Sequence, residues 1–112
     1  MSSALARKLE SLRSKGAMQD SEVASLLGTG TETVSRWHEG RAYPEVDVER
    51  TLLEVEYITD LLADFYAPDE ARTWMFSAQK LLSGASPAEL IQKGRVDEVL
   101  RLVGQLREAA YF

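Results

Sequence analysis

The sequence predicts an all-α fold, and two features indicate it. Apolar residues recur at helical spacing along nearly the whole chain, and no segment shows the strict alternation expected of a β-strand. Glycine, proline and short polar residues fall between these segments, where helices begin and end. The first predicted helix carries Leu5, Leu9 and Leu12 and stops at Gly16, and the others cover about 19–27, 31–39, 46–66, 69–82, 87–93 and 96–109.

The composition is that of a globular protein, with 45% hydrophobic and 28% charged residues in 112. The absence of cysteine excludes disulfides and thiolate metal sites and fits a reducing compartment. No apolar run approaches the roughly 18–20 residues that span a bilayer, and the first residues show no apolar signal core. We therefore expect a soluble cytoplasmic protein.

The formal net charge of −5 is unevenly distributed. Residues 1–45 and residues 67–112 each hold equal numbers of basic and acidic side chains, so the excess acid lies in residues 46–66. A negative protein is a poor ligand for nucleic acid, because phosphate neutralisation drives such binding. The N-terminal part is itself neutral, so the charge does not exclude DNA binding there.

These changes in net charge along the chain divide it into three predicted parts: 1–45, 46–66 and 67–112. The middle part reads as one long amphipathic helix whose apolar stripe is wider than a single two-helix contact needs. We therefore expect this helix to pack on two sides and to serve self-association. The stripe consists of Val48, Leu52, Val55, Leu62 and Tyr66 and is widened by Leu53, Tyr57, Leu61 and Phe65.

Residues 20–39 have the pattern of a helix-turn-helix, which requires two short helices joined by a tight turn. Ala24 is small where the helices would touch, and Gly28 sits where the turn needs a left-handed backbone. A capping box from Thr29 to Glu32 should start the second helix. The residues expected to point inward are Val23, Leu27, Val34 and Trp37.

The second of these helices leaves a polar face outward, as a helix that enters the major groove does. Arg36 is suited to a bidentate contact with guanine or to a phosphate, and short hydroxyl side chains can bond to either. An alternative is a helical hairpin that only packs. The candidate DNA-binding residues are Thr31, Glu32, Thr33, Ser35, Arg36, His38 and Arg41.

The segments 23–28 and 33–44 resemble the helix-turn-helix of the Xre/Cro repressors. The block Trp74-Met75-Phe76-Ser77, followed by Leu81-Leu82 and by Ser86-Pro87-Ala88-Glu89-Leu90-Ile91, resembles the C-terminal domain of the Xre/ParS antitoxins, in particular the MbcA-like group of RES-Xre type II toxin–antitoxin systems. The resemblance implies a partner, a RES-domain toxin that consumes NAD. It also implies that the C-terminal helices of the antitoxin cover the active site of the toxin.

The candidate toxin-binding residues are Arg95, Arg101, Arg107, Tyr111 and Phe112. The arginines recur every six residues around the last helix, which fits a solvated face as well as a partner-facing one. The two aromatics would dock either into the core of this chain or into a partner. By spacing, Trp74, Met75, Phe76, Leu81, Leu82, Leu90 and Ile91 belong to the core.

Catalysis finds little support, because one histidine and no cysteine leave no nucleophile–histidine pair and no zinc arrangement. We expect no enzyme activity, no cofactor and no metal. His38 would be a polar surface residue or a phosphate contact.

Three hypotheses follow. The first is an antitoxin that binds a RES-type toxin and represses its own operon through operator DNA, as a homo-oligomer and in a hetero-oligomer with the toxin. The second is a stand-alone Xre-type regulator whose C-terminal half oligomerises. The third is an interaction protein whose helix-turn-helix has lost DNA binding.

Overall fold

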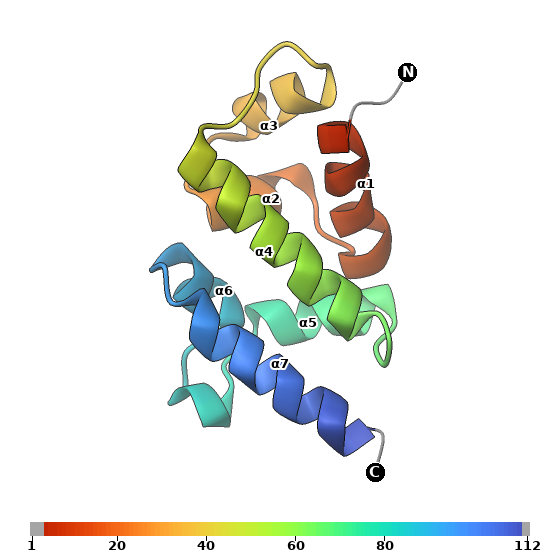
Figure 1. Ribbon diagram of the computed structural model, residues 1–112, viewed down its shortest axis with the longest axis vertical. Coiled ribbons are helices and arrows are strands. Elements are labelled where there is room, and N and C mark those ends of the chain that lie inside the picture. Colours follow the sequence, from red (N-terminus) through yellow and green to blue (C-terminus); the bar gives the residue numbers. More distant parts are fainter. Residues whose placement is uncertain (1–3, 111–112) are drawn as a thin grey trace.

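The computed structural model describes residues 4–110, and all regular structure in that range is helical (Figure 1). This confirms the all-α fold class. The described helices are α1 (Ala4–Gly16), α2 (Asp20–Leu27), α3 (Thr31–His38), α4 (Val46–Leu62), α5 (Pro68–Phe76), the 3₁₀ turn η1 (Lys80–Leu82), α6 (Pro87–Gln92) and α7 (Val96–Ala110).

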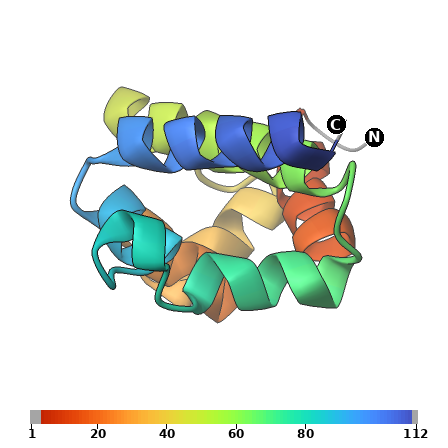
Figure 2. The same cartoon turned by 90° about the horizontal axis from the view of Figure 1, so that it is seen from below.

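The helices form two layers around a shared core. Figure 2 shows α4 and α7 side by side in one layer, with α5 and α6 opposite. Helix α1 packs against α4 and α5, and α2 packs against α6, so contacts join the three parts that the charge pattern suggested. The largest fully buried side chains come from both halves of the chain: Leu12, Leu52, Ile58, Leu62, Met75 and Leu90.

Helix α4 is shorter than the sequence predicted, since it ends at Leu62 and not at Tyr66. Residues 63–66 instead form tight turns, in which the backbone N–H groups of Phe65 and Tyr66 both donate to the carbonyl of Leu62. Pro68 restricts the preceding residue to extended backbone, which sets the latest possible end of the helix, but the end at Leu62 comes earlier than this restriction requires. Ala67 is extended, with φ −67° and ψ 159°, so the helix must stop before it.

The predicted helix over 69–82 is also wrong in its second half, because α5 ends at Phe76 and only the short turn η1 follows. The side-chain amide of Gln79 donates to the carbonyls of Trp74 and Ser77, at 3.0 and 3.3 Å, and so caps the end of α5. This break changes the register, and Leu81 is 72% exposed where helical spacing had placed it in the core.

The other predicted helix boundaries lie within one residue of those in the structure. Ser86 caps α6, accepting the Glu89 N–H at 3.1 Å, with Pro87 at the first helical position. Gly94, at φ +77°, follows the end of α6 in the left-handed conformation that glycine adopts freely. On α7 the buried side chains are Val99, Leu102 and Val103.

Two polar links cross from α2 to the C-terminal helices. The Gln92 amide donates to the carbonyl and hydroxyl oxygens of Ser25, at 3.0 and 2.9 Å. The Arg72 guanidinium donates two hydrogen bonds to the Glu22 carboxylate. Partial burial by itself raises the pKa of Glu22, but the bonds from Arg72 and from the Gln19 N–H outweigh it, and the pKa is lowered.

None of the helices described between residues 4 and 110 combines the length and the apolar character needed to cross a bilayer.

Candidate functional site

The α2–turn–α3 unit has the geometry that the sequence pattern predicted. Gly28 adopts φ 69° and ψ 33°, which turns the chain at the end of α2, and the Thr29 N–H bonds back to the Ala24 carbonyl at 2.9 Å. Ala24 is buried at the contact, as expected. The four residues expected to point inward are also buried: Val23, Leu27, Val34 and Trp37.

The predicted capping box of Thr29 and Glu32 does not form. Gly30 takes the N-cap position of α3 with extended backbone, φ −92° and ψ 156°, and it has no side chain to accept a bond. Thr29 therefore lies one residue too early to cap. A capping bond exists one helix earlier, where the Glu22 carboxylate accepts the Gln19 N–H at 3.0 Å.

The candidate DNA-binding residues do not all face the same way. Thr31, Glu32 and Arg36 are exposed on α3, and Arg41 is exposed just beyond it. Thr33 and Ser35 are half-buried, and Ser35 lines a groove of about 230 Å³ shared with α1 and α2. The exposed face of α3 is therefore narrower than the seven candidates suggested.

His38 faces back toward α2 and not outward. Its Nε2 lies 3.1 Å from Asp20 Oδ1, and both side chains are about one quarter exposed. The groove around it is also lined by Glu10 and Arg13 of α1 and by Glu39. His38 thus links the two helices of the unit.

The positive charges on and just after α3 are each offset by a nearby carboxylate. Arg36 lies 3.8 Å from Glu32 one turn earlier, and Arg41 lies 2.6 Å from Glu39. Each of the two arginines that could bind a phosphate is thus paired with a carboxylate beside it. Phosphate attraction at this face is therefore weaker than the arginines alone would give.

The three arginines on and before α7 differ in their surroundings. Arg95 donates two hydrogen bonds to Glu98, and these bonds raise its pKa. Arg107 lies 3.7 Å from Asp64 in the turn after α4. Arg101 is exposed; the pKa of the neighbouring Glu98 is lowered first by its hydrogen bonds with Arg95 and to a lesser extent by the charge of Arg101, but the Glu98 carboxylate is hydrogen-bonded to Arg95 and not to Arg101. Tyr111 and Phe112 lie outside the described residues.

A small surface groove of about 120 Å³ joins Arg101 to the turn η1. Gln105 and Leu102 of α7 line one side, and Leu81 lines the other. An exposed leucine beside an unpaired arginine is a combination suited to contact with another protein. Sequence reasoning missed this patch because it had placed Leu81 in the core.

A second apolar surface follows the outer face of α4. Leu53 and Tyr57, one turn apart, are 42% and 56% exposed, and Val46 and Tyr43 are more exposed still. The opposite face of α4 is buried, with Leu52 at 0%. The wide stripe predicted from the sequence is thus only partly covered within one chain.

The chain resembles proteins of known function along most of its length. No protein-family model matches it. The mycobacterial cidal antitoxin MbcA of Mycobacterium bovis and that of Mycobacterium tuberculosis are each 32% identical over 90 residues, covering 80% of this chain and 80% of the relative. The chain belongs to the MbcA antitoxin family.

The fold agrees with this membership. In the crystal structure of the M. tuberculosis MbcT–MbcA toxin–antitoxin complex, a chain superposes with a TM-score of 0.83 and 29% identity, over 96% of both chains. The match includes α1 and α7 as well as the central helices, because so little of either chain is left out. The resemblance to MbcA-like antitoxins noted in the sequence is confirmed.

Proposed function

We propose that this protein is the antitoxin of a type II toxin–antitoxin pair and neutralises a cognate toxin by binding it. The observation that carries the proposal is membership in the MbcA family, together with a fold match to a structure in which MbcA is part of a complex with MbcT. The protein acts in the cytoplasm by binding and not by catalysis.

The toxin is of the RES type and consumes NAD, and the C-terminal part of the antitoxin, residues 67–112, covers its active site. Arg101 and Leu81 support a contact through this part of the chain, because both are exposed and neither side chain is held by a hydrogen bond or a salt bridge among the described residues. The proposed toxin-binding residues remain Arg95, Arg101, Arg107, Tyr111 and Phe112, to which Leu81 is added.

Co-expression with the product of the adjacent gene tests this function. The antitoxin should restore growth and cellular NAD, and a chain lacking residues 111–112 should rescue less well while keeping its helical signal. A chain that binds its promoter yet restores neither growth nor NAD would instead be a stand-alone regulator.

Residues 1–45 bind operator DNA and repress the operon, with the exposed face of α3 in the major groove. Arg36 is the central contact, because it is exposed and can turn from Glu32 to a guanine edge. The paired charges on α3 predict a shallow dependence of affinity on salt and a need for several copies of α3 on one operator. Binding measured from 50 to 300 mM salt checks the slope.

Residues 46–66 supply the self-association through the exposed face of α4. The test uses Leu53→Glu and Tyr57→Glu, because both side chains are exposed in the single chain and their loss leaves the core intact. Leu52→Glu is the contrasting variant and should unfold the protein, because Leu52 is fully buried. A wild-type protein that sediments as a monomer at high micromolar concentration would contradict self-association.

A further inference from the structure

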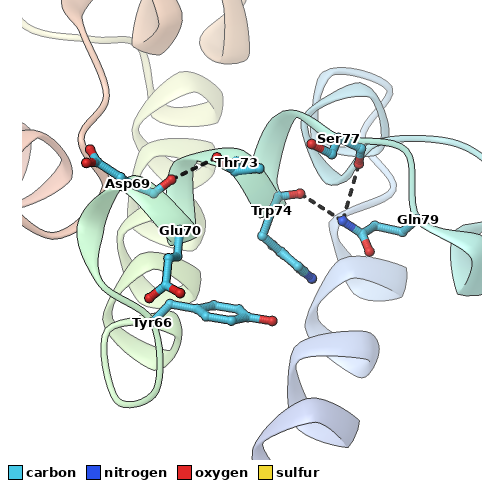
Figure 3. Close-up of a pocket in the computed structure, with 7 residues that line it drawn as sticks. All are labelled: Tyr66, Asp69, Glu70, Thr73, Trp74, Ser77 and Gln79. Carbon is cyan, nitrogen blue, oxygen red and sulfur yellow. Dashed lines mark hydrogen bonds between the residues drawn. The ribbon is translucent and has the colours of Figure 1, made fainter.

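An aromatic cavity of about 420 Å³ lies between the turn after α4 and helix α5 (Figure 3). Tyr66 and Trp74 supply its rings, and Glu70, Ser77 and Gln79 supply polar groups at its edge. The cavity is a shallow groove open to solvent and not an enclosed pocket. The antitoxin function as proposed above does not use it.

The cavity contains an unpaired donor. Trp74 is only 8% exposed, and its indole N–H makes no hydrogen bond to residues 4–110; no fully buried side-chain polar atom in that range lacks a partner, so this N–H lies open to solvent. In Figure 3 the indole nitrogen of Trp74 and the Tyr66 hydroxyl, both from residues that line the cavity, lie toward the same side. Because solvent reaches this N–H, it is free to donate to an acceptor from outside the chain.

The charged side chains that line the cavity are all acidic. The Glu70 carboxylate lies beside the Tyr66 ring (Figure 3), and it accepts the Ala67 N–H with one oxygen at 2.8 Å, which leaves the other oxygen available. No basic side chain of the described residues lines the cavity. The basic residue of α5, Arg72, is bound to Glu22 instead. Two aromatic rings beside a carboxylate favour a cation.

We propose that this cavity receives an arginine side chain of the partner toxin; the identity of that partner rests on the antitoxin function proposed above. The guanidinium stacks on the Tyr66 ring and pairs with Glu70, and the exposed edge of Trp74 donates its indole N–H to a backbone carbonyl of the same toxin segment. Arginine fits better than lysine, because its planar group stacks on rings while it donates several hydrogen bonds.

The position of the cavity favours the toxin over other occupants. The ion pair of Arg107 with Asp64 holds the last turns of α7 beside the turn that carries Tyr66. The cavity therefore adjoins the proposed toxin-binding surface. DNA is disfavoured, because its phosphates would meet the Glu70 carboxylate.

A titration of the free protein tests the chemistry without the toxin. The chain has two tryptophans, so its two indole N–H resonances can be followed by NMR, with the buried Trp37 as internal control. N-acetyl-arginine-N-methylamide should shift the Trp74 resonance saturably and leave Trp37 unmoved. The citrulline analogue, which has nearly the same shape but no charge, should bind about threefold to tenfold more weakly.

Glu70→Gln should weaken arginine binding by a similar factor without unfolding the protein, because glutamine can still accept the Ala67 N–H. Asp97→Asn, which removes an exposed carboxylate from the first turn of α7, is the matched control and should change nothing. Equal binding of the arginine and citrulline compounds, or an unchanged affinity in Glu70→Gln, would overturn the proposal.

The purified complex identifies the occupant. Glu70→Gln should weaken toxin binding at least threefold, and wild-type affinity for the toxin would exclude the toxin arginine from this cavity. If removal of residues 111–112 moves the Trp74 resonance of the free protein, the occupant is this chain itself and the proposal fails. If no version of the chain binds the toxin while arginine still titrates Trp74, the antitoxin function is wrong and only the arginine chemistry survives.

Discussion

Replacing Arg101 with alanine should weaken toxin binding more than replacing either of the other arginines near α7. Arg95 is already bound to Glu98 by two hydrogen bonds, and Arg107 already has Asp64 at 3.7 Å. Arg101 has no ion pair within the described chain and lies beside the exposed Leu81. Its guanidinium can therefore bind a partner without first breaking a bond inside the antitoxin.

The expected loss of toxin affinity depends on whether the arginine is already bonded within the antitoxin. A hydrogen bond to a charged group contributes about 1.5–3 kcal/mol, so Arg101→Ala should raise the Kd for the toxin by roughly tenfold to 150-fold. Arg95→Ala should raise it less, because that side chain must give up Glu98 before it can contact the toxin. Neither change should unfold the protein, because substitution of exposed surface groups usually shifts stability by no more than about 0.5 kcal/mol.

Isothermal titration of the purified toxin with the two variants and the wild type measures both constants, and urea denaturation of each antitoxin alone checks stability. The reasoning is refuted if Arg101→Ala binds as tightly as wild type, or if Arg95→Ala loses more affinity than Arg101→Ala. A loss that appears only together with a lower urea midpoint would show that Arg101 acts on the fold and not on the contact.

Three further predictions concern the rest of the molecule. Arg36→Ala should weaken operator binding by about 1–3 kcal/mol with an unchanged helical signal, as fluorescence anisotropy and circular dichroism can test. Gly16→Ala should cost about 1–3 kcal/mol in urea denaturation, because a Cβ there would lie 3.1 Å from the Thr59 methyl, and adding Thr59→Ser should recover part of the loss. Because the pKa of Glu22 is lowered in the folded state by Arg72, its stabilisation should be present at neutral pH and lost as pH falls below the ordinary value of 4.5. The stability gap between wild type and Glu22→Gln should therefore close toward pH 3, and a gap of constant size would contradict this assignment.

Local signals in the sequence predicted the helices well where one residue sets the boundary. Ser86, Pro87 and Glu89 start α6 through bonds that span three residues, so the pattern can be read directly from the sequence. Gly28 is a similar case, because its left-handed backbone depends on the residue itself. The end of α5 has no such signal, because its cap comes from Gln79 beyond the helix.

The candidate sites were harder to predict because their properties depend on distant residues. Arg107 and Asp64 are far apart in sequence, so nothing in the chain near either residue indicates that they pair. The outward direction of α3 followed from helical spacing, but the turning of His38 toward Asp20 depends on how α2 and α3 cross. The cavity beside Trp74 is invisible in a pattern that marks this residue only as apolar core.

The packing bears on how toxin binding can affect DNA binding. Gln92 joins α6 to Ser25, and Arg72 joins α5 to Glu22, so both links end on the helix that precedes α3. Helix α1 also contacts α3, α4 and α5, and the buried side chains form one continuous cluster. A hinge between the proposed DNA-binding part and the proposed toxin-binding part would have to break these links and open the core, which costs far more than the few kcal/mol that typical allosteric coupling supplies. We therefore expect toxin to change operator affinity through assembly, by setting how many α3 helices one complex presents and at what spacing, and not by reorienting α3 within a chain.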